Sequence, residues 1–126
     1  MGESGPSSGR PRVVPLRKEP TGGSDASLKK DVSELDDGLE AVLALRPVTW
    51  RWKDERDGVD LQYGFIAQEV EEVIPELVSE GTWNDGTTRK FLNTGDMVPY
   101  LVKALKEQQA QIDRLQSIVD DKLGDR

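Results

Sequence analysis

A heptad repeat of apolar residues near the C-terminus constrains the fold of this chain more than any other feature. The repeat begins after Gly95, and Val98 is taken as position a. The a positions are then Val98, Leu105, Ile112 and Val119, and the d positions are Leu101, Gln108, Leu115 and Lys122. Such a pattern predicts one long helix with an apolar stripe. A chain of 126 residues has too little other material to cover this stripe, so we expect the partner helices of a coiled coil to cover it.

The first turns of this helix have a second possible partner, which is the chain's own domain. The residues that would pack there are Met97, Val98, Leu101, Val102 and Leu105. Beyond Gln108 an oligomer is favoured. β-Branched residues at a with leucine at d favour a dimer, and the polar Gln108 in the seam weakens that preference. The residues expected at the oligomer interface are Val98, Leu101, Leu105, Gln108, Ile112, Leu115 and Val119.

Composition excludes several classes of function. Without cysteine or histidine, the chain has no disulfides, no Ser-His-Asp triad and none of the usual zinc sites, and we expect neither a metal nor a cofactor. Any nucleophilic catalysis must therefore use lysine or a carboxylate as its base. The net charge of −7 argues against nucleic-acid binding, which depends on clustered Lys and Arg. No apolar run approaches the ~20 residues of a membrane span, so we expect a soluble protein without a membrane partner.

The length allows one small domain with tails. Residues 1–23 contain four prolines, five glycines and three serines, a linker composition that predicts a disordered or extended segment. The alternatives are an expression tag or misassigned start, and the end of a longer upstream polypeptide. Residues 24–94 are expected to form the domain, and residues 95–126 the C-terminal helix.

Within residues 24–94 the periodicity alternates between helix and strand. The expected elements are a helix over 39–45, a strand over 48–53, a helix over 67–74 and a hairpin of 77–79 with 88–92. Pro47 and Pro75 end the two helices, Trp50 and Trp52 share one face of the strand, and Asp85-Gly86 suits the hairpin turn. The predicted fold class is α+β: a small domain of short helices and β-hairpin strands followed by a long C-terminal coiled-coil helix.

Ser24 and Lys29 stand five residues apart where the linker meets the domain. Spacing alone favours turn or cap residues. The other interpretation is a nucleophile with its base, since serine needs an adjacent base to attack a carbonyl. A lysine base must be neutral, whereas the reference pKa of lysine is about 10.4, so burial or a neighbouring cation has to favour the neutral form. Burial at a subunit interface would make cleavage depend on assembly.

Four segments of the chain form an ordered set: residues 24–29 (SDASLK), 44–52 (ALRPVTWRW), 64–70 (GFIAQEV) and 98–109 (VPYLVKALKEQQ). This set resembles the peptidase S74 family, the C-terminal intramolecular chaperone and auto-processing domain of phage tail spikes, tail fibres and endosialidases. The family pattern usually reads Ser-Asp-x-Arg-Leu-Lys, and this chain has Ser27 where the arginine is common.

The resemblance implies a homotrimer that helps an upstream β-helical or stalk segment to fold and then releases itself by cutting before the serine. Carried over to this chain, the cut falls between Gly23 and Ser24, with Ser24 as the nucleophile and Lys29 as the base. If it comes from a phage, the chain is expected in a virion tail or in the host cytoplasm during assembly. The alternatives are a trimerisation and attachment module that does not cleave, and a standalone coiled-coil adaptor.

Overall fold

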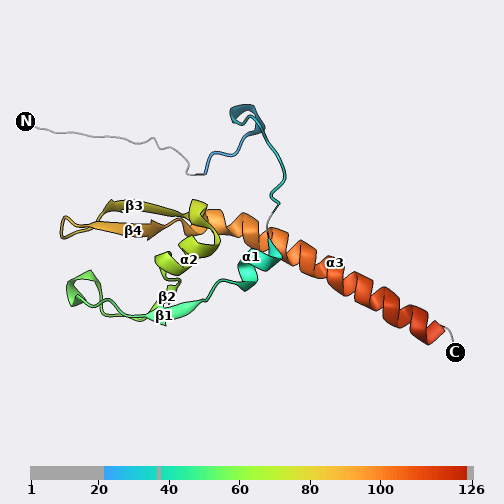
Figure 1. Cartoon of the computed structure of the whole chain (residues 1–126). Coiled ribbons are helices and arrows are strands. Elements are labelled where there is room, and N and C mark those ends of the chain that lie inside the picture. The colour runs from blue at the N-terminus through green and yellow to red at the C-terminus, as the bar shows by residue number, and fades with distance from the viewer. Residues whose placement is uncertain (1–21, 37, 125–126) are drawn as a thin grey trace, which may run out of the picture. The chain divides into compact units, whose positions relative to one another are not determined.

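A computed structural model describes residues 22–36 and 38–124, and the chain divides into two units. The first unit, Met1–Glu34, is described from Gly22 onward, and the second, Leu35–Arg126, contains the strands and α-helices labelled in Figure 1. Most of the predicted linker lies outside the described residues.

The second unit alternates helices and strands as predicted. Its elements are α1 (Leu39–Leu43), β1 (Val48–Trp50), β2 (Gln62–Gly64), α2 (Ala67–Val73), β3 (Val78–Thr82), β4 (Thr88–Leu92) and α3 (Met97–Gly124). β1 pairs with β2 and β3 pairs with β4, both antiparallel. The predicted α+β fold class is thereby confirmed, with short helices and two β-hairpins followed by one long helix.

The ends of these elements follow local sequence and pairing. α1 ends before Pro47 and α2 ends before Pro75, which begins a short 3-10 turn over Pro75–Leu77. Proline ends a helix because it has no backbone N–H to donate to the next helical hydrogen bond. The first strand ends at Trp50 and does not reach residue 53 as predicted. Its ladder partner β2 has three residues, and the last pair joins Trp50 to Gln62.

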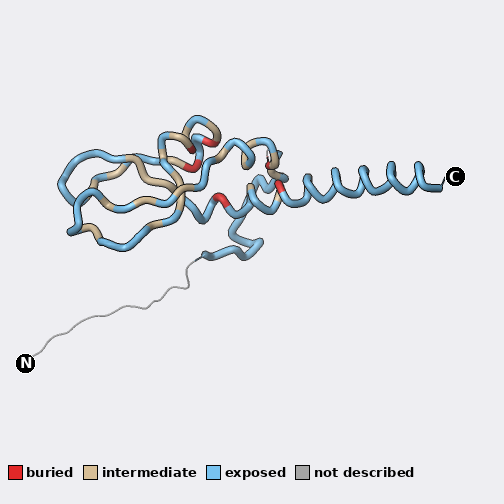
Figure 2. Tube along the Cα trace, turned by 90° about the horizontal axis from the view of Figure 1, so that it is seen from below, coloured by how far each residue is buried: buried red, intermediate tan, exposed pale blue. Residues whose placement is uncertain are grey.

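A small apolar core joins α2, the following 3-10 turn and the start of α3. Val70 and Ile74, four residues apart, are buried together with Leu77 and Met97, and Figure 2 marks the buried positions in red. Residues four apart lie on one face of a helix, so the sequence of α2 presents its apolar face to this core. Burying each such side chain contributes roughly 1.5–3 kcal/mol.

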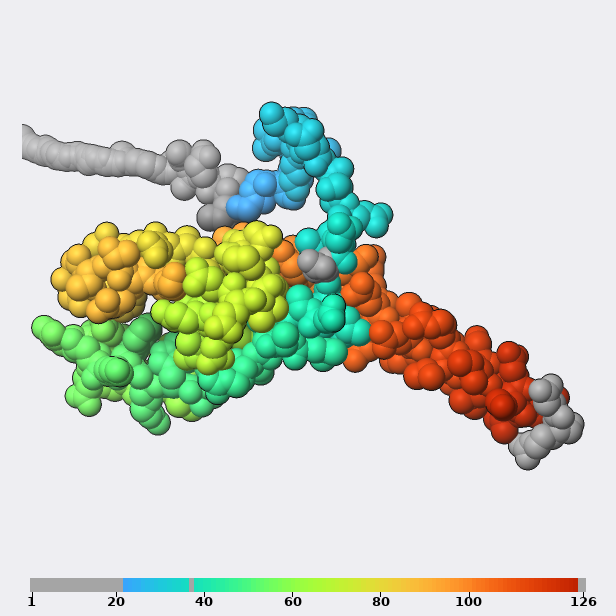
Figure 3. All heavy atoms as spheres, viewed as in Figure 1, coloured from blue at the N-terminus to red at the C-terminus, as the bar shows by residue number. Residues whose placement is uncertain are grey.

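A row of aromatic rings links the two hairpins. Trp50 and Trp52 are half-buried while the residues between and beside them are exposed, which confirms their predicted common face. The ring centroid of Trp52 lies 6.0 Å from that of Trp50 and 5.5 Å from that of Trp83, which in turn lies 5.9 Å from Phe91. These rings line an open hollow of about 1040 Å³ between the hairpins (Figure 3).

Two adjacent faces of α3 have different surroundings. Met97 and Ala104 are buried and Tyr100 is half-buried, and this face packs against the core and α1. Of the residues expected to pack on the domain, Met97 does so. The structure leaves the others exposed: Val98, Leu101, Val102 and Leu105. For these four, packing on the chain's own domain is not seen, because residues 97, 100 and 104 lie on one side of a 3.6-residue helix and these four side chains lie beside them.

The second half of α3 is exposed throughout (Figure 2). Gln108 is exposed, and Ile112, Leu115 and Val119 are 51%, 62% and 48% exposed, so this part of the predicted stripe faces outward. Among the helices that the structure describes, α3 included, none combines the length and apolar character needed to cross a membrane.

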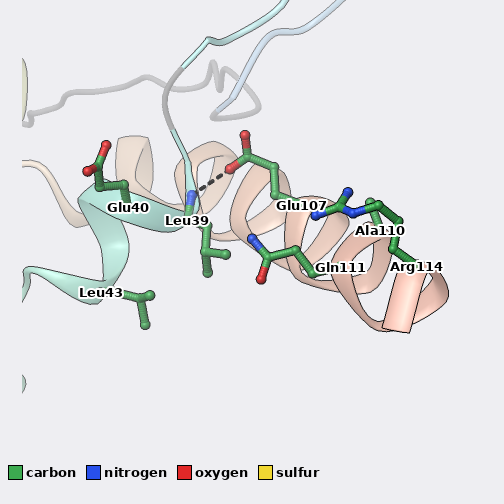
Figure 4. Close-up of a pocket in the computed structure, with 7 residues that line it drawn as sticks. All are labelled: Leu39, Glu40, Leu43, Glu107, Ala110, Gln111 and Arg114. Atoms are coloured by element: carbon green, nitrogen blue, oxygen red, sulfur yellow. Dashed lines mark hydrogen bonds between the residues drawn. The ribbon is translucent and has the colours of Figure 1, made fainter. Parts of the chain in front are cut away.

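The start of α1 is joined to α3 by a polar contact between residues far apart in sequence. The backbone N–H of Leu39 donates to Glu107 Oε1 at 2.7 Å (Figure 4). Gly38 is buried beside it, and a Cβ atom there would lie 2.5 Å from Lys103 Cγ and 2.8 Å from Glu107 Oε1. A helix begins with unsatisfied N–H groups, so Glu107 satisfies one of them from another helix, and Gly38 leaves room for it.

Candidate active site

The predicted Ser24–Lys29 pair lies on one tight turn of the first unit. A 3-10 helix, η1, spans Ala26–Leu28. Asp25 caps it, because its Oδ1 accepts the backbone N–H of Ser27 at 2.9 Å and the hydroxyl of Ser27 at 2.6 Å. The backbone N–H of Leu28 donates to Asp25 O at 3.0 Å, and that of Lys29 to Ala26 O at 3.2 Å. Five residues of extended chain would span about 17 Å, so the turn is what brings Lys29 close to Ser24.

The turn brings the two predicted catalytic residues into direct contact. Lys29 Nζ lies 2.6 Å from Ser24 Oγ, and the hydrogen bond runs from the ammonium to the hydroxyl oxygen. This distance is within the range in which a base can take a proton from a nucleophile. For that transfer the direction must reverse, with a neutral amine accepting the hydroxyl proton.

The peptide bond before Ser24 follows a bend at glycine. Gly22 has φ +78°, in the left-handed region that residues with a side chain rarely adopt. Gly23 has no such requirement, and a Cβ atom there would meet Leu28 Cδ1 at 3.9 Å, an ordinary contact. The two glycines before Ser24 are therefore not equivalent: the backbone conformation of Gly22 favours glycine, and the surroundings of Gly23 do not require it.

Every described residue of the first unit is exposed. Leu28 and Val32 are 75% and 80% exposed although they are apolar. The pKa of Asp25 is held below its ordinary value, first by the hydrogen bond from the Ser27 hydroxyl and then by the Ser27 backbone N–H. Asp25 therefore stays ionised beside the pair, with its charge directed at Ser27.

Two of the sequence motifs meet in the second unit. Arg46, in the segment 44–52, donates to both carboxylate oxygens of Glu69, in the segment 64–70, at 3.0 and 2.6 Å. This pairing holds the pKa of Glu69 below its ordinary value. Glu71 likewise accepts from Lys90 Nζ at 3.1 Å. Glu69 and Glu71 thus tie α2 to neighbouring segments.

Sequence reasoning missed the pairing of Asp25 with Ser27 and the capping of α1 by Glu107. The first had a signal, since aspartate often bonds the backbone two residues ahead. The second had none, because Leu39 and Glu107 are 68 residues apart. The seven predicted oligomer residues lie along one exposed face of α3.

Comparison with known proteins bears on the same segment. Residues 24–79 match the family described as chaperone of endosialidase, peptidase S74. The chain is similar to that family over this region. The match begins at Ser24, includes Lys29, Arg46 and Glu69, and ends in β3, which confirms the resemblance predicted from the sequence.

A curated phage protein is similar over a longer stretch. The chain is 30% identical over 105 residues to the long tail fiber protein Gp37 of Enterobacteria phage M1. The match covers 80% of this chain and 41% of the phage protein. The chain thus spans less than half the length of this relative, and the similarity extends beyond the peptidase S74 region.

Proposed function

We propose that the chain is an assembly chaperone for a phage tail fibre that trimerises and then cuts itself between Gly23 and Ser24. The observation that supports cleavage most strongly is the 2.6 Å contact between Lys29 Nζ and Ser24 Oγ, located where the peptidase S74 match begins. The assembly role is supported by that family and by the similarity to a long tail fiber protein. The client would be a β-rich fibre or stalk segment upstream.

The proposed reaction is local, because Ser24 follows the bond that it attacks. Neutral Lys29 takes the hydroxyl proton, and Ser24 Oγ adds to the carbonyl carbon of Gly23. The C–N bond then breaks, and the nitrogen of Ser24 receives the proton from Lys29. The product is an ester between Gly23 and Ser24 Oγ. Water hydrolyses this ester to a Gly23 carboxyl group and restores the hydroxyl, which leaves Ser24 as a new N-terminus.

Assembly would control this reaction through the surroundings of Lys29. A single chain leaves the segment exposed, where an ammonium is well solvated. Burial disfavours the charged form of a lysine, so a covering partner would favour the neutral base. The exposed side chains of Leu28 and Val32 supply an apolar surface beside Lys29 that such a partner would bury.

The exposed stripe of α3 is the proposed trimer interface. Ile112 at position a and Ser117 at position f, away from the stripe, are both exposed. Ile112→Asp should reduce the trimer to monomer in analytical ultracentrifugation and slow self-cleavage, because a charge at a core position of a coiled coil is buried without a partner. Ser117→Asp is the matched control and should assemble as the wild type does. A trimer that survives Ile112→Asp contradicts this interface.

Mass spectrometry of the purified chain tests cleavage directly. Wild type should begin at Ser24, whereas Ser24→Ala and Lys29→Arg should remain intact, because arginine keeps the charge but does not deprotonate in proteins. Lys30→Arg and Ser33→Ala are the matched controls and should cleave. An assembled wild-type trimer that stays intact would reject self-cleavage and favour the alternative, a trimerisation and attachment module that does not cleave.

A further inference from the structure

Resting on the proposed self-cleavage, we infer that Ser27 is a positioning residue for that reaction, because its hydroxyl and N–H hold the Asp25 carboxylate and so shape the turn that brings Lys29 to Ser24. Asp25 and Ser27 lie between Ser24 and Lys29, inside the loop that the contact of these two residues closes. Asp25 Oδ1 accepts both donors of Ser27, at 2.6 and 2.9 Å, while Lys29 Nζ reaches Ser24 Oγ at 2.6 Å. The residue that departs from the usual family pattern thus has a defined partner.

The turn depends on these bonds because little else holds it. η1 has three residues, and a helix so short is unstable in isolation. The described residues of the first unit, 22–34, are all exposed, so burial contributes little to holding the turn. The local hydrogen bonds therefore set how often Leu28 and Lys29 adopt the conformation seen here, and with it how often the amine meets the hydroxyl.

The same hydrogen bonds control where the negative charge of Asp25 points. Asp25 precedes Lys29 by four residues, close enough for a freed carboxylate to reach the ammonium. Within the described first unit the two form no ion pair, and the Asp25 carboxylate is directed at Ser27. A carboxylate that paired with Lys29 would stabilise its charged form and compete with Ser24. Ser27 thus both shapes the turn and keeps Asp25 away from the base.

A time course of self-cleavage in cell-free translation of the full chain tests this role. Ser27→Ala removes the hydroxyl and should slow cleavage about two- to tenfold, the range expected for one side-chain hydrogen bond. Ser27→Thr keeps the hydroxyl and should restore the rate. Asp25→Ala should slow cleavage to a similar degree, and Asp25→Asn, which still accepts both bonds, should cleave faster than Asp25→Ala.

The double variant Asp25→Ala with Ser27→Ala separates a joint role from two independent ones. If the residues act as a pair, it cleaves no more slowly than Asp25→Ala alone. Multiplied defects, or wild-type cleavage by Ser27→Ala, would overturn the inference. Trimer content and the thermal midpoint should not change in any of these variants, because the pair lies outside the apolar core.

Amide exchange by NMR gives an answer that does not depend on cleavage. In a Ser24→Ala background, which keeps the chain intact, adding Ser27→Ala should speed exchange of the N–H groups of Leu28 and Lys29, which close the turn. Unchanged exchange would overturn the inference even if wild type cleaves. Faster exchange combined with an intact wild-type chain would reject the proposed function and leave the positioning of the turn supported.

Discussion

The segment around Ser24 and Lys29 (the dyad segment) and the second unit with its apolar core (the body) are stabilised by different interactions. In the body, apolar side chains from α2, the following turn and α3 are buried against one another. Around Ser24 the described residues are exposed, and the turn is closed by hydrogen bonds between residues at most five apart. The residues that stabilise the fold and those of the proposed reaction therefore lie in different parts of the chain, and substitutions should separate the two roles.

The largest expected contrast comes from one substitution made in each region. Leu77→Ala removes a side chain that is 2% exposed in the core and should lower the free energy of unfolding by about 2–5 kcal/mol. Leu28→Ala, compared in the same monomeric Ile112→Asp background so that no partner chain covers the segment, removes one that is 75% exposed and should leave it nearly unchanged. Urea denaturation at one fixed protein concentration measures both. Equal losses would mean that the dyad segment is part of the folded core.

A pair of glycines within the body gives the next largest effect. Gly38→Ala places a methyl group 2.5 Å from Lys103 Cγ, which forces α1 and α3 apart and should destabilise the fold by about 1–3 kcal/mol. Gly95→Ala is the control, because its nearest contact would be an ordinary 3.6 Å. The thermal unfolding midpoints of the two variants are compared. Equal midpoints would show that α1 and α3 can move apart without loss of stability.

The glycines before Ser24 test the other region, with cleavage as the measurement. Gly22→Ala must hold a side chain at φ +78°, which costs roughly 1–2 kcal/mol, so the cleavage rate should fall about five- to thirtyfold if this bend is needed for attack. Gly23→Ala has space for its methyl group and should cleave at nearly the wild-type rate. The free energy of unfolding should not change in either variant. Equal rates would show that the bend at Gly22 is not used.

The smallest expected effect is the pH dependence of an exposed ion pair in the body. Arg46 lowers the pKa of Glu69 below its ordinary value of 4.5. The pair therefore stabilises the fold fully above that value and loses its contribution as the pH falls through the lower folded-state pKa. Glu69→Gln should lower the thermal midpoint slightly at pH 7, and the difference from wild type should shrink toward pH 3. Glu72→Gln, in the same helix, is the control, and an identical pH profile for it would contradict the assignment.

Much of the fold was predictable because its signals are local. Pro47 and Pro75 end helices by removing a donor, Trp50 and Trp52 alternate with exposed residues, and Asp85-Gly86 turns the β3–β4 hairpin. The length of β1 was not predictable from its own residues, because the three-residue partner β2 limits the ladder. The contact of Arg46 with Glu69 was not predictable either, since the two residues are 23 positions apart and meet only in the folded chain.

The candidate site was predicted as a pair of residues, and the structure adds the turn that joins them. The spacing of Ser24 and Lys29 allowed contact, and the capping of η1 by Asp25 produces the conformation in which it occurs. Ser27 was noted for what it replaces in the family pattern. Its bonds to Asp25 are what give it a role in the proposed reaction.

By itself, the sequence determined the helical and strand periodicity of the apolar residues, the ends of the helices, and the spacing of Ser24 and Lys29. All three depend on residues that are close along the chain. The tertiary structure alone decided which face of α3 the domain covers. Met97, Tyr100 and Ala104 lie beside the heptad stripe, and both faces are apolar enough to be buried. The periodicity of the sequence identifies both apolar faces of α3 but does not show which of them the domain covers. The choice depends on where α1 and the core of α2 meet the helix, and Glu107 secures that contact from 68 residues away.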